Sequence, residues 1–403
     1  MRTSFFPLLL AAVLAACDPF DPGIVGYRSR SDCGPHRPGD RVEQAGPDEP
    51  GPAPGPVFQL DTTVYYCAVR FPDGYDWQRD TAYGSVPFEL LLYRDFEPVL
   101  TLPSGPDACF VPDPDRHHLA GGHLYTERMA DGQTRIGRDG VELFRFPGRE
   151  YLVGLLEDGE DLYTLSRPAK GDGFTFRRNG DVLLRQPSGT PFGSLTDPSY
   201  GPSGALYRDQ EQVCFCYASG KGPQQTFHAV RDGLAQQLEE LPPGTSVLDL
   251  KLIRGQAVAL RPDFRGERLS EGRLWVSGQA FAVTGRFSDG AGWYSGYMKD
   301  GGAPERLCRE EAALYVASGR AAAVSADAAG DVRWYGPESG RESLSCHFFT
   351  PACAAFLPGA PWLALTPRDT RHRPFVRSGT RVHEVDVNGY VSSLAVTVSL
   401  RPR

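Results

Sequence analysis

Histidine and aspartate side chains gather in one short stretch of the chain. Asp113, Asp115, His117, His118 and His123 lie within eleven residues of one another. Imidazoles and carboxylates are ligands that Zn²⁺ takes in proteins, and a histidine can act as a general base near neutral pH. The alternative is a polar loop between two strands, because the stretch opens with alternating proline and aspartate. We favour the loop, and therefore predict no metal, no cofactor and no catalytic residue here.

Two clusters of carboxylates, at residues 157–161 and 310–311, are also poor candidates for catalysis. Glycoside hydrolysis needs two carboxylates that face each other across a substrate, and neighbours in one turn do not. The sequence contains no Gly-x-Ser-x-Gly, no His-Glu-x-x-His and no phosphate-binding glycine loop. No residue type or spacing therefore singles out an active site.

The first seventeen residues resemble the export signal of bacterial lipoproteins. Arg2 precedes an uncharged apolar run over residues 5–16, which is too short to span a bilayer but matches a signal peptide. The run ends in Leu-Ala-Ala followed by Cys17, which resembles a lipobox. The resemblance implies cleavage before Cys17, acylation of that cysteine with palmitate-like chains, and anchorage at a membrane. The alternative is an ordinary secretory signal. Asp18 resembles an inner-membrane retention signal in enteric bacteria only, so the choice of membrane stays open.

The remaining cysteines fit an exported protein. An even number in such a chain favours disulfides, whose connectivity cannot be read from sequence. We predict one bridge, Cys346–Cys353, because a short proline-containing loop separates these residues. Cys214 and Cys216 alternate along a predicted strand, so their side chains share one face; we predict no metal site there. The eight cysteines other than Cys17 are Cys33, Cys67, Cys109, Cys214, Cys216, Cys308, Cys346 and Cys353.

The residue composition and the pattern of apolar residues change at residue 57. Residues 17–56 hold the candidate lipidated cysteine and a Pro/Gly-rich stretch that cannot bury a core, which is typical of a disordered tether. From residue 57 to 403, short runs of Val, Tyr, Phe and Leu alternate with Gly, Pro, Asp and Asn. This pattern predicts an all-β domain. The predicted organisation is a signal peptide (1–16), a tether (17–56) and one β domain (57–403).

The β domain contains a repeat of about 40 residues. Hairpins centre on Arg-Asp-Gly or Arg-Asn-Gly at residues 138–140, 178–180 and 231–233, and a strand with a Leu-Tyr pair precedes most of them. Asn, Asp and Gly tolerate the positive φ of tight hairpin turns. The first copy, at residues 94–96, has Phe in place of Gly. Weaker copies follow at residues 274–283, 306–316, 332–344 and 375–385.

This period, with three or four strands per unit, predicts a β-propeller of seven or eight blades. A pair of β-sandwiches or a β-helix is the alternative. The final strand, residues 390–400, is expected to close the ring. The plan of signal, tether and ring resembles the propeller lipoprotein of the outer-membrane β-barrel assembly machinery, although the blade motifs differ. The body is more similar to uncharacterised β-propeller lipoproteins of GC-rich Gram-negative bacteria, a resemblance that implies a fold and no activity.

Two classes of function fit this plan. The first is a non-enzymatic binding or scaffolding lipoprotein of the envelope, with an envelope protein or a glycan as partner. The second is a glycan-active hydrolase or lyase with its site at the ring centre. We favour the first, because it needs only shape and surface. Trp77, Tyr83 and Tyr200 are candidates to line a binding face. The formal net charge of −8 argues against nucleic acid as a partner.

Overall fold

The computed structural model of the chain is built almost entirely of β-strands. It describes residues 11–13, 58–79, 86–103, 117–195, 203–277, 280–317, 320–336, 339–342, 344–346, 353–355, 361–369 and 371–402. The chain divides into two compact units, one with Met1–Ala15 and Thr63–Thr397, the other with Ala16–Thr62 and Val398–Arg403. The ring described below belongs to the first unit. Within the described residues, no helix is long and apolar enough to cross a membrane.

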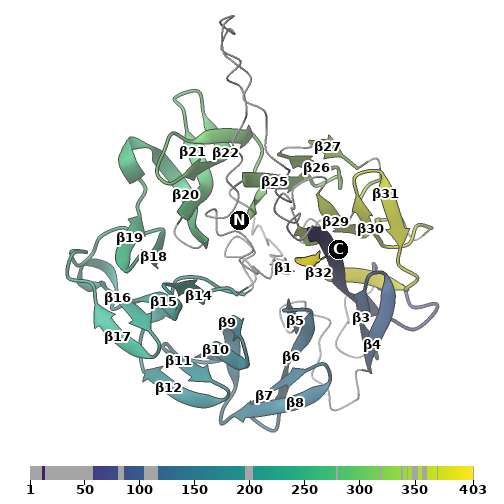
Figure 1. Ribbon diagram of the computed structural model, residues 1–403, viewed down its shortest axis with the longest axis horizontal. Coiled ribbons are helices and arrows are strands. Elements are labelled where there is room, and N and C mark those ends of the chain that lie inside the picture. Colours follow the sequence, from purple (N-terminus) through teal and green to yellow (C-terminus); the bar gives the residue numbers. More distant parts are fainter. Residues whose placement is uncertain are drawn as a thin grey trace, which may run out of the picture. The chain divides into compact units, whose positions relative to one another are not determined.

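Seven blades of antiparallel strands form a β-propeller over the described ranges (Figure 1). Five of them follow one after another as four- or five-stranded units: β5 (His117–Ala120), β6 (His123–Ala130), β7 (Gln133–Arg138) and β8 (Val141–Phe146); β9 (Glu150–Asp158), β10 (Asp161–Pro168), β11 (Phe174–Arg178) and β12 (Asp181–Gln186); β13 (Thr190–Pro191), β14 (Tyr207–Asp209), β15 (Gln212–Ser219), β16 (Thr226–Arg231) and β17 (Leu234–Gln237); β20 (Arg268–Ser277), β21 (Ala280–Ser288), β22 (Trp293–Lys299) and β23 (Glu305–Cys308); and β24 (Ala313–Ala317), β25 (Arg320–Ala326), β26 (Val332–Tyr335) and β27 (Gly340–Arg341).

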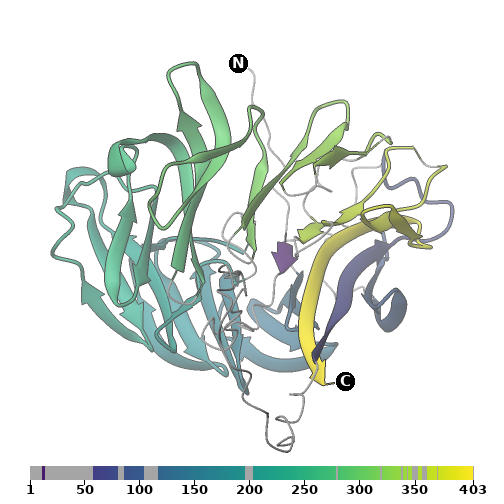
Figure 2. The ribbon, with the colours of Figure 1, turned by 45° about the horizontal axis from the view of Figure 1, so that its top comes forward.

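The remaining two blades meet where the chain closes on itself. The last blade holds β28 (Cys353–Ala355), β29 (Trp362–Leu365), β30 (Phe375–Ser378) and β31 (Arg381–Glu384). In the first blade, β2 (Phe58–Arg70), β3 (Glu89–Arg94) and β4 (Glu97–Pro103) are joined by the C-terminal strand β32 (Gly389–Pro402). Figure 2 shows β32, in yellow, beside the purple strands from the start of the ring. The prediction that the final strand closes the ring is confirmed.

Two short pieces lie outside this regular pattern. A two-stranded sheet, β18 (Asp249–Ile253) with β19 (Gln256–Leu260), falls between the fourth and fifth blades in chain order. It accounts for the eighth repeat in the sequence. The strand β1 (Ala11–Val13) pairs in parallel with β32. The strand β1 falls within the expected signal peptide. The structure contains the uncleaved chain, so the cleavage of that peptide stays a prediction.

The turn residue of the hairpin repeat is hydrogen-bonded to an earlier strand of its blade, and in the first three blades the partner belongs to the Leu-Tyr repeat. In five blades the first residue of the tight turn has a φ between 44° and 52°. Its side-chain oxygen accepts a backbone N–H from an earlier strand of the same blade, at 2.8–3.1 Å, and its own N–H donates to that residue's carbonyl at 2.8–3.0 Å. The turn residues and their partners are Asp95 with Val64, Asp139 with Leu124, Asn179 with Leu162, Asp232 with Val213, and Asp300 with Phe281.

The glycine of the turn is required by close packing between blades. A Cβ atom on Gly140 would lie 2.7 Å from Leu102, and one on Gly233 would lie 3.0 Å from Leu183. Each glycine therefore sits against the outer strand of the preceding blade. In the first blade the same position is Phe96, with a φ of 74°, and its ring stacks on His383 of the last blade at 3.7 Å between centroids. The exception in the sequence thus lies at the joint that closes the ring.

Two weaker repeats were wrongly assigned. Residues 274–283 form a hairpin of β20 and β21, which are the first two strands of their blade and not its third and fourth. Residues 306–316 were expected to form a hairpin, but they run from β23 of one blade to β24 of the next. The turn of that blade lies earlier, at Asp300 and Gly301. The two-stranded sheet β18–β19 precedes this blade and interrupts the period of 40 residues. Repeats that are counted by spacing alone therefore no longer fall on equivalent strands.

The two ends of the ring carry different connections. Within each blade, the first and second strands and the third and fourth strands are mostly joined by tight turns at one end. The antiparallel pairing places the other connections at the opposite end, which we call the loop face. Several long connections belong to it, among them those between β2 and β3, between β17 and β18 and between β29 and β30. Loops on a rigid scaffold are the usual carriers of binding residues.

Candidate functional site

Histidine and carboxylate side chains from neighbouring blades meet among the inner strands. His117 and His118 lie on β5, the first strand of the second blade. The His117 Nε2 atom is 2.7 Å from the Oγ of Ser392 on β32 of the first blade. Both side chains are buried. The expectation that these two histidines belong to a polar loop is therefore wrong: they open a buried strand.

The serine and histidine have the spacing of a nucleophile and its base, but not the orientation. Ser392 Oγ donates to the carbonyl of Cys67 at 3.2 Å. The hydroxyl proton is thereby committed, and the imidazole is the donor to Ser392. Burial, and secondly the neighbouring His118, lowers the pKa of His117 to about 3. A base this weak has little driving force to take a proton at neutral pH.

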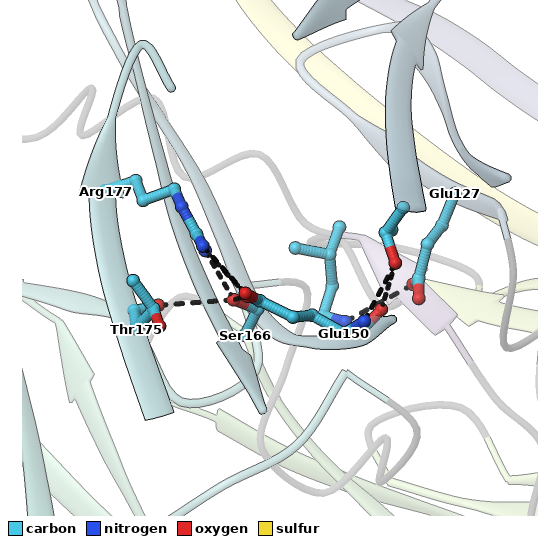
Figure 3. A network of polar contacts seen from close by, with 7 residues as sticks. Glu127, Glu150, Ser166, Thr175 and Arg177 are labelled. Carbon is cyan, nitrogen blue, oxygen red and sulfur yellow. Dashed lines mark hydrogen bonds and ion pairs between the residues drawn. The ribbon is translucent and has the colours of Figure 1, made fainter. Parts of the chain in front are cut away.

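A second cluster joins the second and third blades (Figure 3). The Arg177 guanidinium donates from both Nη atoms to the two carboxylate oxygens of Glu150, each at 2.9 Å. Ser166 contacts both partners, and donates to the carbonyl of Thr175 at 3.3 Å. The guanidinium also lies 3.9 Å from the centroid of the Phe146 ring. Arg177 is 1% exposed, so this charge is held entirely by protein groups.

Glu127 completes the arrangement without joining Glu150 as a catalytic pair. Its Oε2 accepts the N–H of Leu152 at 3.3 Å and lies 4.0 Å from the Nε2 of His118. Its Oε1 and the His118 Nε2 have no hydrogen-bond partner among the described residues. Glu127 is 1% exposed and Glu150 is 9% exposed. A glycan could not reach between these carboxylates without opening the blades.

The sequence-predicted histidine cluster is therefore divided. His117 and His118 join the inner network, but the Nδ1 of His123 contacts Asp139 at 2.5 Å, beside the tight turn of its own blade. Asp113 and Asp115 lie outside the described residues. Within the described ranges, no group of three or more His, Cys, Asp or Glu side chains is placed to hold a metal ion.

The described cysteines are buried thiols. Cys214 and Cys216 pack in one core cluster while Phe215 packs in another, as their alternation predicted. Burial raises the pKa of the Cys346 thiol to about 12. Cys353 opens β28, but its side chain, like Cys17, Cys33 and Cys109, lies outside the described residues. The Cys346–Cys353 bridge is not shown and stays a prediction.

Among the predicted face aromatics, only Trp77 can be placed. It is 5% exposed and lies 5.3 Å from the Tyr390 ring and 6.2 Å from the Phe71 ring, measured between centroids. The expectation that Trp77 lines a binding surface is wrong, since it belongs to the core. Tyr83 and Tyr200 lie outside the described residues.

The loop face carries an open cleft where the first and last blades meet. We call it the seam cleft; its volume is about 620 Å³. Arg70 Nε contacts Glu89 Oε2 at 2.6 Å, and Arg373 contacts Asp386 at 3.1 Å. Sequence patterns gave no signal for it, because its residues come from the two ends of the ring. The lining residues are Arg70, Phe71, Pro72, Asp73, Pro87, Phe88, Glu89, Pro103, Arg373, Asp386 and Asn388.

Comparisons with known proteins show no family model and no curated protein that matches this chain. Two crystal structures of BBS1N in complex with ARL6DN, soaked with mercury or lead, are similar at 12% identity. They align over 68% and 69% of this chain and 79% and 84% of theirs, with TM-scores of 0.34 and 0.35. A structure from a study of two prolyl endopeptidases aligns over 83% of this chain and 54% of its own, at 10% identity and a TM-score of 0.36. We take no functional argument from these scores.

Proposed function

We propose that this chain is a non-enzymatic binding or scaffolding lipoprotein of the bacterial envelope. The observation that carries the proposal is a contrast between two sets of ionisable groups. Those at the inner strands, such as Glu150 and Arg177, are buried and engaged with one another. Those at the loop face, such as Arg373 and Asp386, are exposed around an open cleft. Buried and mutually bonded pairs are closed to a ligand, whereas exposed polar groups around a cleft are available to a partner.

The form of the ring supports the same proposal. Paired backbone and side-chain hydrogen bonds fix the tight turns to the strands of their blades. The strands are therefore held in place, and they form a rigid base for the longer connections at the opposite end. A preformed surface loses little conformational entropy when it binds. The partner would be an envelope protein or a glycan.

The membrane anchor belongs to the proposal through the lipobox resemblance alone. Acylation of Cys17 and the Pro/Gly-rich stretch up to residue 56 would hold the ring at a distance from the periplasmic face or the cell surface. Replacement of Cys17 by Ala should abolish the incorporation of a labelled fatty acid in growing cells. Equal label on the wild type and on Cys17→Ala would remove the anchor from the proposal.

The binding function itself is tested by two measurements on the same protein. The full chain is cross-linked in its native envelope, and partners are identified by mass spectrometry. The purified full chain is then incubated with envelope and extracellular glycans, and new reducing or unsaturated ends are counted. A reproducible partner without turnover supports the proposal. Reproducible cleavage that is lost when a central carboxylate such as Glu127 is replaced by Gln, in a variant whose thermal unfolding is unchanged, would establish the glycan-active enzyme instead.

A further inference from the structure

The seam cleft has a preformed floor. Asn388 Nδ2 donates to the carbonyls of Pro72 at 2.7 Å and Tyr75 at 3.0 Å, and the Phe71 N–H donates to the Asn388 carbonyl at 2.8 Å. Phe71 and Phe88 are buried beneath it, with ring centroids 6.3 Å apart. Since these contacts join the start and the end of the ring, the cleft exists only when the ring is closed.

The walls of the cleft carry charges of both signs in pairs. Arg70 is held by Glu89, and Arg373 is held by Asp386. The side chains of the first pair are 42% and 37% exposed, so solvent or a ligand reaches them. A guanidinium has five N–H donors and a carboxylate about four acceptor positions. Each pair therefore offers both kinds of hydrogen-bonding group beyond the bond that joins its members.

This balance of charge decides the kind of ligand. With Asp73 included, two guanidiniums face three carboxylates, so a strong anion or a strong cation would meet like charge as well as opposite charge. A hydroxyl group carries no charge and can donate and accept hydrogen bonds at the same time. A ligand with many hydroxyl groups can therefore bond to both the guanidiniums and the carboxylates. Three prolines at the rim, Pro72, Pro87 and Pro103, add apolar C–H surface beside these polar groups.

We infer that the seam cleft is a binding site for a neutral oligosaccharide. Its volume of about 620 Å³ is within the range of small-molecule sites, roughly 300–1,000 Å³. The inference rests on the proposed function and names the ligand class for it. The Arg70–Glu89 and Arg373–Asp386 pairs bind the hydroxyl groups, and the proline rim contacts the C–H faces of the sugar rings.

Saturation-transfer NMR on the purified full chain tests this site. The probes are maltotetraose, cellotetraose and chitotetraose, with a proline-rich peptide as the other class. At least one tetrasaccharide should receive saturation. Arg373→Gln and Glu89→Gln should each weaken its binding about tenfold, since each removes a charged hydrogen-bond partner. Glu142→Gln is the matched control, because it removes the carboxylate of an exposed Arg–Glu pair on β8, outside the cleft. This control should bind like the wild type.

The outcomes separate this inference from the function on which it rests. Thermal unfolding of each variant confirms that the ring is intact. Saturation of the peptide alone, of no probe, or of a tetrasaccharide regardless of the cleft variants overturns the inference, while an envelope partner found by cross-linking would leave the binding function standing. Loss of the tetrasaccharide's own signals during the measurement would mean turnover, which contradicts the proposed function instead.

Discussion

At the scale of single residues, the structure changes the meaning of the most chemically suggestive part of the sequence. His117 and His118 were expected in a polar loop, but they are core residues of a strand. Their neighbours, Ser392 and Glu127, come from other strands and cannot be inferred from spacing. A histidine kept neutral by burial makes a stability contribution that depends on pH.

His117 should make the protein less stable in acid. Its folded pKa is about 3 against 6.5 when unfolded, so below pH 6.5 the unfolded chain binds a proton that the folded chain does not. The contribution is complete above pH 6.5. As pH falls towards 3, this residue lowers the free energy of unfolding by up to about 1.4 kcal/mol per pH unit. The free energy of unfolding is measured by urea titration at several pH values between 7 and 4. Its slope against pH should be smaller for His117→Gln than for the wild type, by the equivalent of about one proton. An unchanged slope would show that His117 is not held neutral.

At the scale of elements, one contact holds a single blade together and another joins two blades. The first is the buried ion pair between Glu150 on β9 and Arg177 on β11 of the third blade, and the second is the turn residue that packs on the preceding blade. Each makes a separate prediction for stability.

Replacing one member of the Glu150–Arg177 pair should lower the free energy of unfolding more than replacing both members. Arg177→Met leaves a buried carboxylate without its partner and should lower the free energy of unfolding by about 3–5 kcal/mol. The double variant Glu150→Leu with Arg177→Met removes both charges and should regain most of that loss. Urea titrations of the two variants provide the comparison. A double variant less stable than Arg177→Met would show that the network is needed as a whole.

Phe96 should contribute packing at the cost of backbone strain. Its φ of 74° is unfavourable for a residue with a Cβ. Phe96→Ala loses the stacking on His383 and keeps the strain, whereas Phe96→Gly loses the stacking and relieves the strain. Both should be destabilised, Phe96→Ala by about 1 kcal/mol more than Phe96→Gly. Thermal melts of the pair test the order. Equal stability, or a more stable alanine variant, would show that φ is not strained at this joint.

At the scale of the whole molecule, the sequence predicted what is local and repeated. Turns such as Asn179-Gly180 depend on neighbouring residues, and the closing strand follows from the repeat. The network could not be predicted, because Ser392 and His117 are 275 residues apart and nothing marks Arg177 among the many other arginines. The sequence leaves the count of blades between seven and eight, because the late repeats are weak and their intervals are uneven. The seam cleft was missed because it forms only when the ends of the ring meet.

The central claim is that partners bind at the loop face. A photo-cross-linking amino acid placed at Asp73, an exposed residue of the seam cleft, should capture in cells an envelope partner that is or carries a glycan. The same amino acid at Glu160, an exposed residue in the tight turn between β9 and β10, should capture nothing reproducible. Gel analysis after irradiation reports both. Adducts from position 160 and none from position 73 would contradict the account, because they would place the binding surface at the end of the ring with the tight turns.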